Sequence, residues 1–226
     1  ARWEIVDRQA GRVDFNPVRR KIAIVGANHC PALAPILEDH TWEVWSCNML
    51  VTRCLDSAYK FRADRWFELH QLKAQNDMDW SWIKACPVPL YCAECPDIDA
   101  VPRAVQFPLA EMIANGARSY YHCTFAYQVA FALSLPQVEA IGIYGVNLPQ
   151  GSMRERSLER ASLEYWLGVA EGRGVAVISP VVGRTGLLHS PYLYGFDYTE
   201  EAQWVREQML GLWNVAQNTD WSIKIP

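Results

Sequence analysis

Short apolar runs alternate along the chain with segments in which apolar residues recur at helical spacing. The apolar runs, rich in β-branched and aromatic residues, predict six strands, at 22–25, 41–48, 66–69, 87–92, 139–147 and 175–179. The helically spaced segments predict helices at 31–37, 108–116, 124–135, 157–171 and 199–217. Strands that alternate with helices are typical of the α/β class, so we expect a three-layer fold with a mostly parallel central sheet.

Two helices carry patterns that predict what they bury. The helix at 124–135 is apolar on nearly every face except at Tyr127 and Gln128, which predicts burial against the sheet. In the helix at 157–171, one apolar face is predicted from Leu158, Ala161, Tyr165 and Val169.

The segments between these elements set the expected domain limits. Residues 71–84 suit a surface loop or short helix, 94–107 a crossing loop, and 181–194 a glycine-bearing loop that closes over a ligand. We expect an N-terminal arm or edge strands at 1–20, one α/β domain at 21–198, and a C-terminal helix and tail at 199–226.

Composition narrows the class of partner. The 226 residues are 50% hydrophobic, which suits one globular domain and argues against disorder. A net charge of −4 argues against a protein held on nucleic acid mainly by phosphate neutralisation, but leaves nucleic acid open as a transient substrate. No apolar stretch approaches a signal sequence or membrane span in length, so we expect a cytoplasmic protein with no membrane partner.

Seven cysteines, an odd number, suit reduced thiols in a cytoplasmic chain. Cys92 and Cys95, with Cys86 upstream, invite a zinc interpretation, but no second pair or nearby histidine supplies a fourth ligand. We therefore predict no metal site.

Glycine and a small polar residue follow two of the predicted strands. Gly26 and Asn28 end the first strand, and Gly145 and Asn147 end the fifth. Glycine permits a tight turn and a close approach of the backbone to a ligand, and such turns aim N–H groups at an anion. The lone glycine is not a dinucleotide fingerprint, and an ordinary structural turn remains the alternative.

Two more polar residues lie where a parallel sheet places ligands. Asn48 follows the second strand, at the expected carboxyl edge, and Thr124 opens the helix at 124–135. The alternatives are that Asn48 only closes a turn and that Thr124 only caps the helix.

The stretch 62–70 carries the densest charge around a predicted strand. Asp64 and Arg65 precede its apolar residues, and Glu68 and His70 end it. Arginine holds phosphate or carboxylate in a fork, and histidine moves a proton near neutral pH. We expect Asp64, Arg65 and Glu68 to contact phosphate or substrate and His70 to act as a catalytic base, against the alternative of a packed or surface histidine.

The motifs at 24–31, 45–48, 62–70, 141–147 and 164–168 together resemble a family of small, mostly uncharacterised bacteriophage proteins, over about residues 20–195. They are more distantly similar to the bacterial lipooligosaccharide sialyltransferases. That resemblance implies a Rossmann-like fold and a nucleotide-sugar co-substrate with no tightly bound cofactor. It also implies a nucleotide pocket lined by Gly26, Asn28, Asn48, Thr124, Gly145 and Asn147.

The chain departs from the sialyltransferase pattern at two points. Asn147 stands where the pattern has aspartate, and no histidine precedes the helix at 157–171 where the family's catalytic base lies. If the chain is an enzyme, the base is then His70 or Glu155.

The leading hypothesis is a phage-encoded glycosyltransferase that uses a nucleotide sugar in the host cytoplasm, with a modified DNA base as one candidate acceptor. Two alternatives remain open: a non-catalytic binding or structural protein, for example a homo-oligomer joined through its last helix, and another nucleotide enzyme such as a pyrophosphokinase or hydrolase.

Overall fold

The computed structural model describes residues 20–28, 30–48, 62–70, 80–94, 101–146, 148, 152, 155–180, 186–189, 203–204 and 207–208. The chain divides into two compact units, Ala1–Pro180 and Val181–Pro226. Most of the predicted N-terminal arm, closing loop and last helix lies outside the described residues. Within the described part, no helix has the length and apolarity that a membrane crossing requires.

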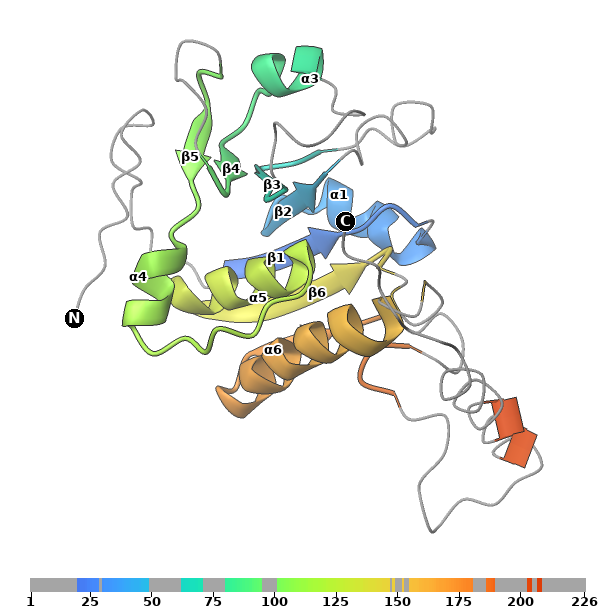
Figure 1. Ribbon diagram of the computed structural model, residues 1–226. Coiled ribbons are helices and arrows are strands. Elements are labelled where there is room, and N and C mark those ends of the chain that lie inside the picture. Colours follow the sequence, from blue (N-terminus) through green and yellow to red (C-terminus); the bar gives the residue numbers. More distant parts are fainter. Residues whose placement is uncertain are drawn as a thin grey trace, which may run out of the picture. The chain divides into compact units, whose positions relative to one another are not determined.

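The first unit is built on a parallel sheet of seven strands, which confirms the predicted α/β architecture (Figure 1). Its order is β5-β4-β3-β2-β1-β6-β7, and every paired neighbour runs parallel. The strands are β1 Arg20–Val25, β2 Trp42–Cys47, β3 Arg65–Glu68, β4 Leu90–Cys92, β5 Ala104–Gln106, β6 Val138–Tyr144 and β7 Ala176–Ile178.

The helices of this unit occupy the connections between strands. A 3₁₀ turn, Pro31–Leu33, leads into α1, Ala34–Glu38. The remaining helices are α3 Trp80–Ala85, α4 Leu109–Ala114, α5 Thr124–Ser134 and α6 Arg160–Gly172, the last preceded by a π-helical segment, Glu155–Glu159. Parallel strands need such crossovers, because a hairpin cannot join them.

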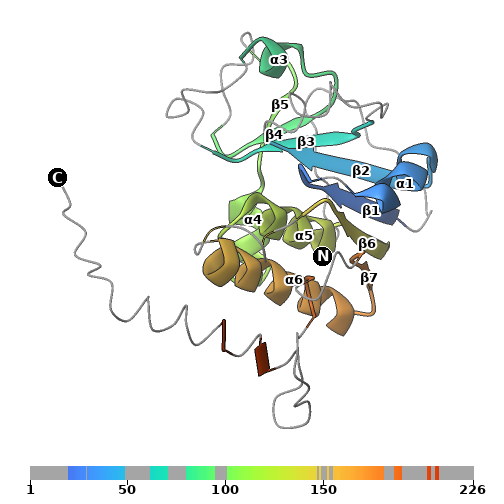
Figure 2. The ribbon, with the colours of Figure 1, turned by 90° about the vertical axis from the view of Figure 1, so that its right-hand side faces the viewer.

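Alternate side chains of the central strands pack into two different layers. In β2, Val44 lies in a cluster with Leu37 of α1, whereas Trp45 packs against Phe131 of α5, with ring centroids 5.5 Å apart. Successive residues of a strand point to opposite faces, so the sheet has α1 on one face and α5 on the other. Figure 2 shows α5 with α6 beside it. The predicted three layers are confirmed.

Strand β5 was not predicted, because its residues lie inside the segment expected to be a crossing loop. Ala104–Gln106 spans three residues, none of them buried, at the edge of the sheet. A strand this short and this exposed leaves no apolar run for the sequence to display.

The predicted apolar face of α6 was also wrong. Leu158 and Tyr165 are 46% and 36% exposed, whereas the buried residues are Ser162, Leu163, Trp166, Leu167 and Ala170. Ser162 is tolerated inside because its hydroxyl donates to Glu159 O at 3.0 Å and accepts from His122 N–H at 3.2 Å. A polar residue thus occupies the buried stripe that the sequence pattern assigned to apolar ones.

In the second unit, the described residues 203–204 and 207–208 are helical. Gln203 Nε2 donates to Glu207 Oε1 at 3.2 Å, the spacing of one helical turn, and Trp204 is 61% exposed.

Candidate functional site at the carboxyl edge of the sheet

Strand β1 is the point at which the sheet reverses its winding. Its neighbours are β2 on one side and β6 on the other, so the chain leaves β1 in one direction and later returns on the opposite side. In doubly wound sheets ligands bind outside the carboxyl ends of strands near such a reversal. The carboxyl edge around β1 is therefore the first place to look for a site.

Backbone hydrogen bonds join the turn that follows β1 to the turn that follows β6. Gly26 N–H donates to Tyr144 O at 2.7 Å, and Asn28 N–H donates to Gly145 O at 2.9 Å. The Asn28 amide Nδ2 also donates to Gly145 O, at 3.2 Å. The turn after β1 is thus held against the turn after β6, which brings Gly26, Asn28 and Gly145 together.

The two glycines are required by this contact. A Cβ on Gly26 would lie 2.5 Å from Gly145 O, and a Cβ on Gly145 would lie 2.4 Å from Asn28 O. Gly145 also has φ +65°, a conformation that side chains disfavour. The close approach that these glycines permit is between two turns of the chain; their contact with a nucleotide stays a prediction.

Beyond the turn after β1 the chain no longer pairs with β2. The pairing of β1 with β2 ends at Ile24 and Trp45, since the chain beyond β1 bonds to the β6 side. Ser46 O instead accepts a hydrogen bond from Gln128 Nε2 of α5, at 3.2 Å. Ser46 also stays paired with Trp66 of β3, so the α5 side chain adds to the strand pairing at this end of β2.

Asn48 follows β2 in the left-handed conformation, with φ 55°. Its N–H donates to Phe67 O at 3.0 Å, and its carbonyl accepts from Trp66 Nε1 at 3.2 Å. Its side-chain Oδ1 is buried and has no hydrogen-bond partner among the described residues. Asn48 does close a turn, and its amide oxygen keeps an unmet capacity to accept.

Glu68 and His70 form a hydrogen-bonded pair at the carboxyl end of β3. Glu68 is 2% exposed, and its Oε1 lies 2.7 Å from Nδ1 of His70, whose side chain is 47% exposed. In the tautomer that carries the proton on Nδ1, Glu68 Oε1 accepts from Nδ1–H and fixes the ring, and Nε2 is the nitrogen that can take up a proton. This is the arrangement of an oriented general base.

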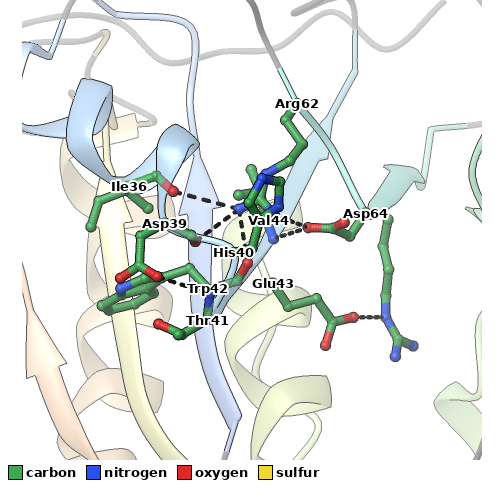
Figure 3. A network of polar contacts seen from close by, with 10 residues as sticks. Ile36, Asp39, His40, Thr41, Trp42, Glu43, Val44, Arg62 and Asp64 are labelled. Atoms are coloured by element: carbon green, nitrogen blue, oxygen red, sulfur yellow. Dashed lines mark hydrogen bonds and ion pairs between the residues drawn. The ribbon is translucent and has the colours of Figure 1, made fainter.

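Asp64 and Arg65 lie at the other end of the same strand. Asp64 Oδ2 accepts from Val44 N–H at 2.7 Å and pairs with Arg62 at 3.7 Å (Figure 3). Arg62 in turn donates to three backbone carbonyls around the end of α1, those of Ile36, Asp39 and Trp42. Asp64 therefore joins the start of β3 to β2 and to Arg62, away from the carboxyl edge where Glu68 and His70 lie.

Arg65 is engaged in the layer between the sheet and α5. Its Nε bonds to Glu43 Oε1, its Nη1 donates to Tyr91 OH at 2.6 Å, and its guanidinium lies 5.4 Å from the ring centroid of Trp45. Burial alone would lower the pKa of Arg65, but Glu43 and Tyr91 outweigh burial and raise it. The guanidinium thus stays charged within a largely aromatic layer.

The N-terminus of α5 is tied to the start of α6. Cys123, not Thr124, is the N-cap residue, and its side chain makes no capping bond; Thr124 is the first helical residue. Cys123 Sγ donates to Glu159 O at 3.7 Å, and burial raises the pKa of this thiol to about 11. The interpretation of Thr124 as the cap was wrong by one position, and its contact with a nucleotide stays a prediction.

The side chains of two predicted site residues lie outside the part of the chain that the structure describes. Asn147 lies outside the described residues, and Glu155 begins the π-helical segment with a side chain that also lies outside them. Among the described cysteines, Cys30, Cys47, Cys86 and Cys123 are free thiols. No group of three metal-ligating side chains occurs within the described part of the chain.

Gln128 is the residue of this edge that was not predicted as a site residue. It is fully buried, and its Oε1 has no hydrogen-bond partner among the described residues. A buried glutamine on an otherwise apolar helix was a visible signal, because such a group needs a specific partner.

A scan against protein-family models found no match, and a search of curated proteins found none either. Among solved structures, the chain is similar to a point mutant of the alpha-2,3/8-sialyltransferase CstII, with 13% identity and a TM-score of 0.42, over 83% of this chain and 100% of that one. It is also similar to the monofunctional alpha-2,3-sialyltransferase Cst-I from Campylobacter jejuni, with 13% identity and a TM-score of 0.45, over 87% of this chain and 96% of that one.

Proposed function

We propose that the chain transfers a glycosyl group from a nucleotide-activated sugar, at the carboxyl edge of the sheet around β2 and β3. The observation that carries the proposal is the bond between the buried Glu68 carboxylate and the half-exposed His70 ring. A neutral hydroxyl is a poor nucleophile, so transfer to a hydroxyl needs a base of this kind.

In the proposed reaction His70 takes the proton of the acceptor hydroxyl on Nε2. The acceptor oxygen forms a bond to the anomeric carbon while the bond from that carbon to the nucleotide phosphate oxygen breaks. The nucleotide leaves with the electron pair, and Glu68 stabilises the imidazolium that results. Glu155, the other predicted base, remains a second candidate for the same proton.

One proposed acceptor is a modified DNA base, because the sequence motifs resemble those of bacteriophage proteins. The net charge of −4 disfavours binding of DNA mainly through its phosphates, so the proposed contact is with a single base. DNA that carries hydroxymethylated bases is therefore the first acceptor to test, with hydrolysis of the nucleotide sugar, in which water replaces the acceptor hydroxyl, as the background reaction.

One observation favours a second candidate function, a binding or structural protein without turnover. The contact between Gly26 and Gly145 explains both glycines without any ligand. In that case the sheet edge keeps its shape but performs no chemistry.

The proposal is tested by measuring turnover of a panel of nucleotide sugars, with the released nucleotide as the measured product. We expect His70→Ala to lower turnover by a factor of about 10² to 10⁴, the usual contribution of a general base. Glu68→Gln should slow turnover while nucleotide binding persists. His40→Ala is the matched control, because this exposed histidine bonds to Arg62 at the opposite end of the sheet. Equal turnover by wild type and His70→Ala removes His70 as the base, and no turnover of any donor favours the binding protein.

A further inference from the structure

The carboxyl end of β2 concentrates buried polar atoms that lack partners. Buried polar groups are hydrogen-bonded in the great majority of cases, so each exception needs a reason. Six such side-chain atoms occur in the described part of the chain, and four belong to β2, to the residue after it or to the α5 side chain bonded to it: Trp45 Nε1, Ser46 Oγ, Asn48 Oδ1 and Gln128 Oε1. Trp45 and Ser46 point to opposite faces of the sheet, so the two amides beside Ser46 are the candidates for a ligand contact: Gln128, bonded to its carbonyl, and Asn48, two residues further along the chain.

Gln128 fixes the chemistry of this site. Its Nε2 donates to Ser46 O at 3.2 Å, which settles the orientation of the amide and leaves Oε1 as the atom without a partner. An amide oxygen only accepts hydrogen bonds. The residue is 0% exposed, so the cost of leaving Oε1 unpaired is not relieved by bulk solvent.

Asn48, two residues after Ser46 in the chain, supplies a second unpaired acceptor. Its Oδ1 is buried and unpaired among the described residues, and the residue as a whole is partly exposed. Two amide oxygens disfavour a phosphate and favour a neutral group with N–H or O–H donors.

We propose that Gln128 and Asn48 bind the nucleoside end of the nucleotide sugar, by accepting hydrogen bonds from its hydroxyl or amino groups. This deepens the proposed function and rests on it. The nucleotide is then oriented with its nucleoside at the end of β2 and its phosphates directed away from these two oxygens. Gln128 becomes a residue that selects the ligand from within α5.

Thermal-shift and calorimetric titrations with the four ribonucleosides and with inorganic pyrophosphate test this proposal. We expect at least one nucleoside to bind the wild type, and Gln128→Met to weaken its Kd by about tenfold or more, the loss of one hydrogen bond. Any binding of pyrophosphate should be unchanged. Gln106→Met is the matched control, because Gln106 also donates an amide to a backbone carbonyl, that of Ala93, but on exposed β5.

Asn48→Gly is the second variant, in case Gln128→Met does not fold. Glycine accepts the left-handed backbone at this position, so the variant removes Oδ1 without adding strain. It too should weaken nucleoside binding about tenfold. If both variants bind nucleosides as the wild type does, a bound water is the sole occupant and the proposal is overturned.

The outcomes separate this inference from the proposed function. Nucleoside binding that depends on Gln128, in a protein without transferase activity, supports the binding site and removes the reaction. Turnover of a nucleotide sugar whose KM is the same in Gln128→Met as in wild type supports the reaction and removes this role of Gln128.

Discussion

Gly26 and Gly145 each occupy the space that a side chain of the other would need. A Cβ on Gly26 would lie 2.5 Å from Gly145 O, and a Cβ on Gly145 would lie 2.8 Å from Gly26 O. The turns after β1 and β6 are consequently fixed against each other, backbone to backbone. The position of Asn28 at the sheet edge depends on this contact.

Gly145→Ala should destabilise the fold by about 2 to 4 kcal/mol, from the left-handed backbone and the backbone clash together. Gly168→Ala is the control, because a Cβ on this helical glycine meets nothing within 4 Å and should stabilise α6 by about 1 kcal/mol. Urea unfolding measures both variants. If Gly145→Ala and Gly168→Ala had the same free energy of unfolding, the two turns would accommodate the added Cβ without loss of stability.

Arg62 joins the end of α1 to the segment before β3. Arg62→Met should lower the free energy of unfolding by about 2 to 4 kcal/mol, since the carbonyls of Asp39 and Trp42 lose their donor and Asp64 loses its ion pair. Arg62→Lys should restore little, because one ammonium cannot reproduce the fork of the guanidinium.

Arg173→Met is the control for this change. Arg173 is exposed and donates to one carbonyl, Leu133 O, at 3.4 Å, so its loss should cost less than about 0.5 kcal/mol. A cost for Arg62→Met as small as that of Arg173→Met would contradict the role described for Arg62.

The buried face of α6 is tested by two leucines. Leu163→Ala should cost about 2 to 5 kcal/mol, because Leu163 is fully buried, whereas Leu158→Ala should cost less than about 1 kcal/mol at 46% exposure. Chemical denaturation compares them directly. The reverse order would restore the face predicted from the sequence.

Alkaline pH should destabilise the fold through Cys123 and Tyr121. Burial raises the pKa of Cys123 from 9.0 to about 11 and that of Tyr121 from 10.0 to about 12. The unfolded chain loses these protons first, so stability that is complete below pH 9 falls as pH rises towards 12.

For Cys123 the expected slope is at most about 1.4 kcal/mol per pH unit between its unfolded and folded pKa values. Tyr121 adds less than a fully buried group would, because solvent screens it. Unfolding measured from pH 7 to pH 11 should show a shallower fall for Cys123→Ser. An identical pH dependence in that variant would mean that the thiol is not responsible.

The sequence predicted the centre of the fold better than its margins. Strand β1 and helix α5 were found because unbroken apolar residues mark elements buried on all sides, as Ile24 and Phe131 are. Strand β5 gave no such signal, since partly exposed edge residues need not be apolar. In α6, Leu163, Trp166, Leu167 and Ala170 form the buried face at helical spacing, and the prediction chose the neighbouring face because Leu158, Ala161, Tyr165 and Val169 recur with the same period.

The sequence indicated only part of the candidate site, because it reveals strand ends but not contacts between residues far apart in the chain. Glu68 and His70 follow β3, and a strand end is visible in the sequence. Asp64 and Arg65 were grouped with them because they are near in the chain, but a strand separates residues along its length. Gln128 was noticed only as an exception on an apolar helix, because its partner, Ser46, is 82 residues away.

The sheet tapers to three residues at each margin, in β5 and β7. An edge strand offers unpaired N–H and C=O groups to which a strand of another molecule can bond, and a short edge strand reduces that risk. The long apolar strands, β1 and β6, are shielded in the interior of the array. At high concentration the fold should therefore resist self-templated aggregation while its native pairing persists, and become vulnerable when β1 and β6 separate.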